Sequence, residues 1–300
     1  MRRTGSGTHS YPLAGGSRAR RRLLMQQSIS DDADLDSLDE LDPESEFAVV
    51  ADDHADDGVL VESDAEIQSV EEPSPIRVSL TPDLDDLRAI TRLLEGTRPV
   101  TWVFTGDSVT HGARYTEGRR SFAEHFAERV RWELRRFVDV VINTGVAGDR
   151  SGGLLKHLDW RALRFQPDVV AIMIGLNDAT LGRQGRETFR DNLQQIIRRI
   201  RDEGAVVLLA TPNQIDFGKA AGHADLRAYV KIIRETARDL EVTCVDHWAH
   251  WKRSVTTGME LNDWLAGDGL HPGSRGHREL ARLTFSKLGI YDESSPSCRP

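Results

Sequence analysis

The sequence is poor in cysteine and in long apolar runs. Its 300 residues include two cysteines, Cys244 and Cys298, too few for the disulfide framework of a small secreted domain. No window approaches the roughly 18 consecutive apolar residues that a transmembrane helix needs. The arginines of residues 18–22 precede only Leu-Leu-Met at 23–25, so the apolar core of a secretory signal, about 7–15 residues, is missing as well. These absences favour a cytoplasmic protein.

Motifs for metal or nucleotide binding are also lacking. There is no His-Glu-x-x-His helix, no cysteine cluster, and no glycine run with Walker or dinucleotide spacing. His247 and His250 lie three residues apart, but two tryptophans flank them, which favours aromatic packing over ligation. A metal enzyme is the alternative that these histidines leave open. We expect no metal and no organic cofactor.

Charge is distributed unevenly along the chain. Residues 1–30 hold six arginines and no acid, whereas residues 31–72 hold eighteen acids and no lysine or arginine. Removing both segments leaves a formal charge of about +3 for residues 73–300. Since the acidic segment has Phe47 as its one aromatic residue, it cannot bury enough apolar surface to offset the entropy of ordering. The sequence predicts a disordered tail over residues 1–80.

This tail is basic over residues 1–30 and acidic over residues 31–72. A solubilising role is the simpler interpretation, and binding of an unknown protein partner through the acidic-hydrophobic pattern is the alternative. Six arginines diluted by glycine and serine are a weak signal for nucleic acid, and we expect none to bind.

From residue 81 the pattern becomes globular. A proline after Thr81 and acids in the next turn predict a helix that closes at Gly96. Short β-branched or apolar runs then alternate with amphipathic stretches, which predicts a three-layer α/β/α sandwich, flavodoxin-like, around a mostly parallel sheet of about five strands. The first expected strand begins at Thr101, and the other four cover 138–142, 169–174, 205–210 and 242–245. The expected helices after it cover 121–136, 153–163, 187–203, 223–240 and 274–288. The domain is expected over 81–290, with a C-terminal tail over 291–300.

Four polar motifs lie at strand ends or in the loops beyond them. They are Gly106-Asp107-Ser108, Asn143-Thr-Gly-Val-Ala-Gly148-Asp149, Gly175-Leu-Asn177-Asp178 and Asp268-Gly-Leu-His271-Pro272. Each motif alone is common in turns, but in an open α/β sheet ligands bind at the carboxyl ends of strands. Together and in this order, over about residues 100–288, the motifs resemble those of SGNH or GDSL-type hydrolases.

The chemistry accounts for these residue types. A serine hydroxyl becomes a nucleophile when a base takes its proton, and a histidine held by a carboxylate does so near neutral pH. We expect Ser108 to be the nucleophile, His271 the base and Asp268 the carboxylate, three residues from the histidine. The resemblance implies an oxyanion hole made by the backbone N–H groups of Ser108 and Gly148 and the Asn177 amide.

Asp107 and Asp178 are expected to support the site by accepting hydrogen bonds within their loops. Asn143 and Asp149 are candidates for the same role around the second motif.

The substrate is less constrained, because the resemblance covers esterases, sugar acetylesterases, thioesterases and lysophospholipases. The connections between the motifs are short, which leaves no obvious hydrophobic lid. Trp160 and Trp264 are candidates to stack on a sugar, although packing is the simpler interpretation of each. We expect a short-chain acyl or O-acetyl esterase acting on a carbohydrate or another polar alcohol. A lysophospholipase or thioesterase, and a catalytically inactive binding module, are the alternatives.

Overall fold

The computed structural model describes residues 86–299. The tail expected over residues 1–80 and the helix start expected at Thr81 lie outside these residues. Across the described range, no helix is long and apolar enough to cross a membrane.

A five-stranded, fully parallel sheet forms the centre of the fold, with the strand order β2-β1-β3-β4-β5. The strands are β1 (Thr101–Gly106), β2 (Val140–Asn143), β3 (Val169–Met173), β4 (Val206–Ala210) and β5 (Thr243–Val245). Their β-branched and apolar residues suit strands that are covered on both faces, and every residue of β4 is buried.

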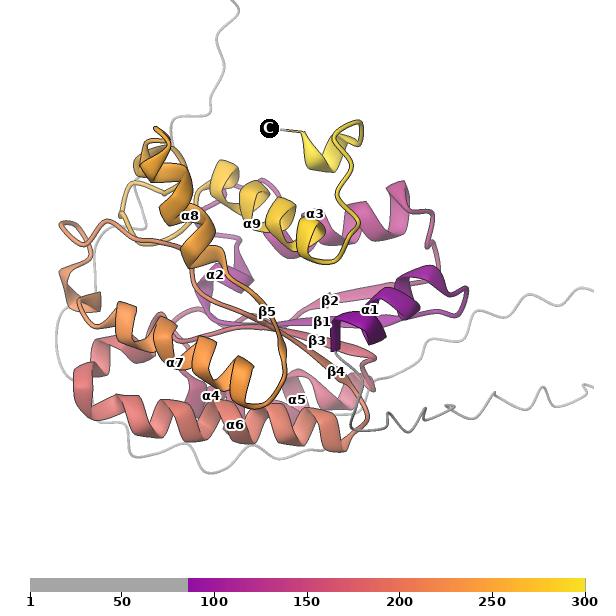
Figure 1. Cartoon of the computed structure of the whole chain (residues 1–300), viewed down its shortest axis with the longest axis horizontal. Helices are drawn as coiled ribbons and strands as arrows, with labels where there is room; N and C mark the ends of the chain where they lie inside the picture. Colours follow the sequence, from indigo (N-terminus) through magenta and orange to yellow (C-terminus); the bar gives the residue numbers. More distant parts are fainter. Residues whose placement is uncertain (1–85, 300) are drawn as a thin grey trace, which may run out of the picture. The chain divides into compact units, whose positions relative to one another are not determined.

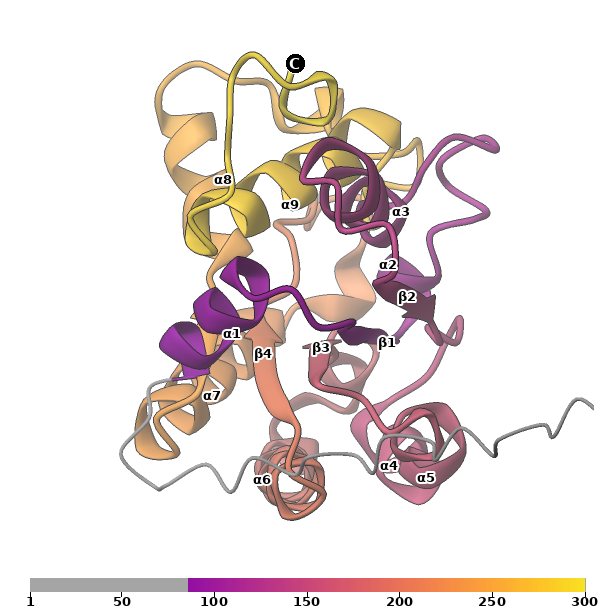
Figure 2. The ribbon, with the colours of Figure 1, turned by 90° about the vertical axis from the view of Figure 1, so that its right-hand side faces the viewer.

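Helices cover both faces of this sheet, as Figures 1 and 2 show. One layer contains α1 (Asp86–Glu95), α3 (Phe122–Glu128), α8 (His247–Thr256) and α9 (Ser274–Lys287). The other contains α4 (Ser151–Lys156), α5 (Leu158–Arg161), α6 (Arg186–Asp202) and α7 (Leu226–Asp239). The three-layer α/β/α fold predicted from the sequence is confirmed.

Some element boundaries differ from the prediction. The helix expected over 121–136 continues from α3 into a π-helix, η1 (Arg129–Glu133), and ends there. The helix expected over 153–163 is two short helices, α4 and α5, which meet at His157. Helix α8 was not predicted, because its sequence offers aromatic residues in place of a clear apolar stripe.

The C-terminal segment packs onto the domain through residue 299. Cys298 is fully buried, the Ser297 backbone N–H donates to Glu133 Oε1 at 2.8 Å, and Arg129 Nε donates to the Ile290 carbonyl at 2.8 Å. The C-terminal tail expected over 291–300 is therefore part of the packed layer formed by α3, η1 and α9 over its described length.

Besides His271, three histidines are buried away from solvent. Burial lowers the pKa of His125 to about 4, with Arg278 and Arg120 adding to the effect. Burial also lowers the pKa of His247 and of His277 to about 3. The ring of His277 is neutral with an acceptor at Nδ1, because the Phe122 N–H donates to that atom at 3.2 Å. All three rings are thus uncharged in the folded protein near neutral pH.

We predict that the free energy of unfolding falls as the pH drops from 6.5 to 5. The histidines of the unfolded chain take up protons near pH 6.5, and the buried histidines of the folded chain do not. Their contribution to the free energy of unfolding is therefore complete above pH 6.5 and is lost as the pH falls below it. Asp107, whose pKa burial raises to about 7, works in the opposite direction and offsets one proton. For these three histidines and Asp107 alone, a balance of two protons corresponds to a slope of about 2–3 kcal/mol per pH unit near pH 5.

Urea unfolding at several pH values measures this slope. The variant His277→Asn keeps an acceptor for the Phe122 N–H. In this variant the slope of the unfolding free energy against pH should decrease by the contribution of about one proton. His157→Asn is the matched control, since the His157 side chain is exposed. A stability that does not change between pH 5 and 6.5 would contradict the prediction.

Candidate active site

The first three sequence motifs meet at one edge of the sheet. Because the strands are parallel, the loops after β1, β2 and β3 all leave from their carboxyl ends. Gly106 closes β1 so tightly against β3 that a Cβ there would lie 2.0 Å from the Met173 carbonyl oxygen. The chain then turns directly into the short helix α2 (Ser108–His111). Glycine at position 106 thus allows Ser108 to follow the strand immediately.

Ser108, His271 and Asp268 form a continuous hydrogen-bonded chain. Ser108 Oγ is 2.8 Å from His271 Nε2, and His271 Nδ1 is 2.6 Å from Asp268 Oδ2. Asp268 Oδ1 also accepts the backbone N–H groups of Leu270 and His271, each at 3.0 Å. A carboxylate at Nδ1 selects the tautomer that carries its proton there, which leaves Nε2 free to accept the serine proton.

The electrostatics keep this histidine neutral. Burial lowers the pKa of His271, Asp268 partly reverses the shift, and the Arg114 guanidinium lowers the pKa further. For Asp268, burial alone would raise the pKa, but the hydrogen bonds from the His271 ring and from the backbone of Leu270 and His271 outweigh it and hold the pKa below 3.8. An ionised carboxylate therefore faces a neutral imidazole.

Gly148 and Asn177 lie in the loops after β2 and β3. The loop with Gly148 is held against β1, because the Val146 N–H donates to the Gly106 carbonyl at 3.0 Å. Gly148 has a φ of 79°, and no atom lies within 4 Å of where its Cβ would be. Asn177 Nδ2 donates to the Asp149 carbonyl at 2.9 Å, which ties the third motif to the second. This part of the loop is exposed and free of side-chain obstruction.

Asp107 and Asp178 lie beneath these loops. Asp107 Oδ1 accepts the Val109 N–H at 2.9 Å and caps α2. Burial raises the pKa of Asp107 to about 7, and its Oδ2 is buried without a hydrogen-bond partner in the described part of the chain. Asp178 accepts the Ser151 N–H at 3.0 Å and hydroxyl at 2.6 Å, and burial raises its pKa too. Both carboxyl groups therefore hold loop backbone.

Asn143 and Asp149 also bond within the second motif. Asn143 Oδ1 accepts the Gly145 N–H at 3.0 Å, and its Nδ2 donates to the Thr110 carbonyl at 2.8 Å. Asp149 Oδ1 accepts the Arg150 N–H at 2.9 Å. The second motif is thereby fastened to α2.

Arg161 was missed by the sequence analysis, although it connects two of the motif loops. Its side chain is 2% exposed, forms an ion pair with Asp149, and donates to the Gly106 carbonyl at 2.6 Å and the Thr144 carbonyl at 3.0 Å. An arginine in a predicted amphipathic helix normally faces solvent, so the pattern gave no signal of this role.

Tyr115 was also missed, because it lies in an irregular loop after α2. Its ring stacks on the His271 imidazole with 3.6 Å between ring centroids and 7° between planes. The Arg114 guanidinium carbon is 5.6 Å from the centroid of the Tyr115 ring. Tyr115 thus covers one face of the histidine.

The two tryptophans proposed to stack on a sugar have different surroundings. Trp264 packs edge-to-face on Trp251, with 5.0 Å between ring centroids, and stacks on His250. Trp160 is 61% exposed, with the Arg164 guanidinium carbon 5.2 Å from its ring centroid. The packing interpretation therefore applies to Trp264. His250 pairs with Glu279, and no cluster of three or more candidate metal ligands occurs among residues 86–299.

We predict that Arg161→Gln lowers the free energy of unfolding by about 3–5 kcal/mol, because it leaves the Asp149 carboxylate and two carbonyls without their buried donor. Urea unfolding measures the loss. Arg164→Gln is the matched control, since this exposed neighbour makes cation-π contacts and should cost at most about 0.5 kcal/mol. Equal losses in the two variants would show that Arg161 does not hold the loops together.

Comparison with known proteins identifies relatives among esterases. The arylesterase of Vibrio mimicus is 28% identical over 149 residues, which cover 49% of this chain and 69% of that protein. The acetylxylan esterase of Geobacillus stearothermophilus is 25% identical over 208 residues, or 63% of this chain and 93% of that protein. The solved structure of a lipase/acylhydrolase from Enterococcus faecalis is similar with a TM-score of 0.53 at 28% identity, over 63% of this chain and 95% of that one.

The family itself follows from a longer match. Residues 104–279, more than half of the chain, match the model of the GDSL-like Lipase/Acylhydrolase family. This segment contains all four motifs, so the resemblance seen in the sequence is confirmed. The chain belongs to the GDSL-like lipase/acylhydrolase family and is a carboxylic ester hydrolase.

Proposed function

We propose that Ser108, His271 and Asp268 form the catalytic triad of this hydrolase. The observation that carries the proposal is the hydrogen-bonded chain from Ser108 Oγ through both ring nitrogens of His271 to Asp268. Structures of the Geobacillus stearothermophilus acetylxylan esterase include variants described as catalytic mutants of a serine, an aspartate and a histidine. In that enzyme the aspartate and histidine are also three positions apart, as Asp268 and His271 are here.

The proposed reaction has two halves. In the first, Ser108 Oγ attacks the ester carbonyl carbon while His271 Nε2 takes the hydroxyl proton. His271 then returns this proton to the alcohol oxygen as the bond from carbonyl carbon to oxygen breaks, which leaves an acyl group on Ser108. In the second half, His271 takes a proton from water, the resulting hydroxide attacks the acyl carbon, and the proton returns to Ser108 Oγ as the acid departs.

The oxyanion formed in each half needs donors that are already in place. We assign this role to the backbone N–H groups of Ser108 and Gly148 and to the Asn177 amide. The open surface at Gly148 and the bond that fixes Asn177 beside the second loop support the assignment.

The substrate we propose is an ester of a short acyl group with a carbohydrate or another polar alcohol. Among the large hydrophobic side chains that are exposed in the described part of the chain, only Val146, in the loop after β2, and Leu181, in the 3-10 helix η3 (Asp178–Gly185), lie in the segments that follow β2 and β3 directly. Such a surface offers little apolar contact to a long acyl chain, which argues against the lysophospholipase alternative. The acetylxylan esterase among the relatives is consistent with an acetyl group.

We keep the cytoplasm as the proposed location and an unknown protein as the proposed partner of the acidic segment 31–72. The first rests on the two cysteines, Cys244 and Cys298, which are both unpaired. The second rests on the acidic-hydrophobic composition of the segment.

We predict that the chain hydrolyses p-nitrophenyl acetate and that Ser108→Ala lowers kcat by about 10⁴-fold or more, as loss of a triad nucleophile does. Asn177→Ala should lower kcat by about 10²–10³-fold, the usual effect of removing one oxyanion donor. Asn143→Ala is a control for the loop, since the Asn143 side chain bonds to the Gly145 N–H within it and to the Thr110 carbonyl of α2.

The profile of esters from acetyl to decanoyl tests the substrate class. A rate that decreases beyond butanoyl is expected, whereas a steady rise to decanoyl would favour the lysophospholipase alternative. If no ester is hydrolysed by the wild type, the inactive binding module becomes the better interpretation.

The pH dependence of kcat/KM provides a separate prediction. The base must be neutral to accept a proton, so activity should rise with pH through the pKa of His271 and reach half its maximum below pH 6.5, since burial lowers that pKa. Asp268→Asn removes the group that raises the pKa of His271. It should therefore shift the rise of kcat/KM with pH to still lower pH and decrease kcat by about 10²–10⁴-fold. A midpoint above 6.5 in the wild type would contradict the lowered pKa of His271.

A further inference from the structure

The loop after α2 places a cation beside the candidate base. Tyr115 stacks on His271, and the Arg114 guanidinium lies over the Tyr115 ring. Asp268 and Arg114 are the two charged groups whose fields alter the pKa of His271. Asp268 is bound to the ring, so Arg114 is the charge that remains available to a ligand there.

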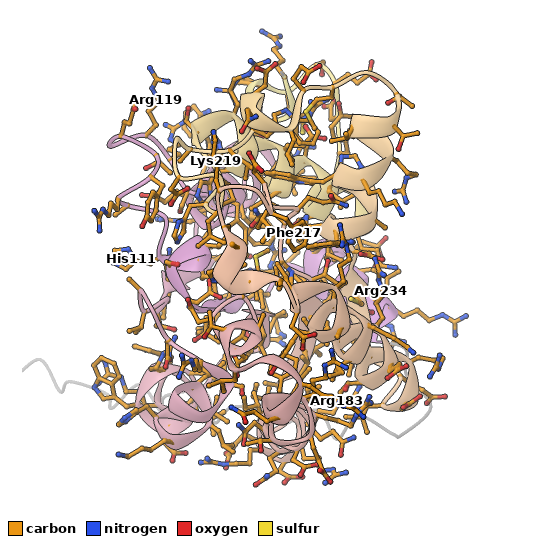
Figure 3. The ribbon with its side chains drawn as sticks, turned by 90° about the vertical axis from the view of Figure 1, so that its left-hand side faces the viewer. His111, Arg119, Arg183, Phe217, Lys219 and Arg234 are labelled. Carbon is orange, nitrogen blue, oxygen red and sulfur yellow. The ribbon has the colours of Figure 1, made fainter. Side chains whose placement is uncertain are left out.

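Two more cations are anchored to the segment that carries His271. Arg119 Nη1 donates to Ser274 Oγ at 3.2 Å, three residues beyond the histidine. Lys219 packs so closely on Gly269 that a Cβ there would lie 2.8 Å from the lysine Cβ. Figure 3 shows Arg119 and Lys219 on the upper part of the face on which His111 marks the end of α2. We refer to Arg114, Arg119 and Lys219 as the cationic rim.

None of the three rim residues has a carboxylate partner within residues 86–299. The acids near them are otherwise engaged or exposed. Asp216 Oδ1 accepts the Gly218 N–H at 2.9 Å, and Asp263 lies 3.8 Å from Arg275. Glu117, in the same loop as Arg114, is exposed to solvent. The rim thus presents positive charge that the described protein does not neutralise by ion pairing.

The position of the rim specifies which part of the ester it meets. In the mechanism proposed above, the histidine protonates the departing alcohol, so groups beside the imidazole face the alcohol part, and the oxyanion donors lie on the other side of the carbonyl. Tyr115 and Arg114 are beside the imidazole. A cation there recognises an anion on the alcohol.

We infer that the preferred substrates are short-chain esters of an alcohol that carries an anionic group, a carboxylate or a phosphate, bound by Arg114 with Arg119 and Lys219 around it. Tyr115, stacked on His271 with the Arg114 guanidinium over its ring, holds the imidazole plane. This inference rests on the proposed ester hydrolysis at Ser108 and adds a requirement on the charge of the leaving alcohol.

A matched pair of esters tests the inference. The probes are 4-acetoxybenzoate, which is anionic at pH 8, and 4-acetoxybenzamide, which is neutral and of the same shape. Their kcat/KM values with the full chain are each divided by the rate of cleavage by free imidazole, to remove the difference in intrinsic reactivity. We expect the wild type to prefer the anionic ester by about tenfold at low salt, with the preference decreasing at 0.5 M NaCl because exposed charges are screened.

Single substitutions test whether the cationic rim causes the preference for the anionic ester. Arg114→Gln should decrease the preference by about three- to tenfold, and Arg119→Gln and Lys219→Gln by smaller factors, since exposed single charges have modest effects. Arg114→Gln should also move the acid limb of the pH profile to higher pH, because it removes a group that lowers the pKa of His271. Arg131→Gln, an exposed arginine on η1, is the matched control and should leave the preference unchanged.

The outcomes are distinguishable. Hydrolysis of both esters with equal corrected kcat/KM, or a preference that survives in Arg114→Gln or is lost equally in Arg131→Gln, overturns the inference and leaves the proposed function intact. Absence of hydrolysis of either ester, and of p-nitrophenyl acetate, overturns the proposed function itself.

Discussion

The parallel pairing of β1 along both of its edges is the constraint on which the rest of the structure depends. β1 pairs with β2 from Thr101 to Phe104 and with β3 from Trp102 to Gly106. The chain leaves β1 toward one side, forms β2, and crosses back to form β3 on the other side. Loops that diverge at such a reversal leave a crevice between them, and this is where open α/β sheets bind ligands. Ser108, Gly148 and Asn177 follow the three strands that define this position.

Buried charge then holds the divergent loops together. Arg161 reaches from α5 to the carbonyls of Gly106 and Thr144 and to the Asp149 carboxylate, so one side chain fixes the ends of two strands relative to each other. Asp178 fastens the start of α4 through Ser151 in a similar way. Hydrogen bonds to charged groups are directional and strong in a water-poor environment, so the loops keep their geometry with little apolar packing of their own.

The sequence predicted the sheet and the contact between Asp268 and His271 because both leave local patterns. Continuous apolar β-branched runs indicate buried strands, and the pairing of Asp268 with His271 depends on a spacing within one turn. Arg161 and Tyr115 left no such pattern, since an arginine in an amphipathic helix and a tyrosine in a loop are ordinary in composition. Their roles arise from contacts with segments 17 and 156 positions away, with Thr144 and His271 respectively. Helix α8 was missed because aromatic residues take the place of a clear apolar stripe in its sequence, and the break between α4 and α5 was missed because tertiary packing overrides local propensity there.

The hydrogen bond between Ser108 and His271 spans 163 positions of sequence. Ser108 begins α2, directly after β1, whereas His271 precedes the last long helix, α9, which packs on α3. During synthesis the ribosome therefore releases the serine long before the histidine and aspartate exist. In the triad proposed above, a nascent chain that ends before residue 268 carries a serine without its base and cannot act on esters in its surroundings. On this proposal esterase activity requires the segment that carries Asp268 and His271, so turnover by a growing or refolding chain would report that this segment has reached Ser108.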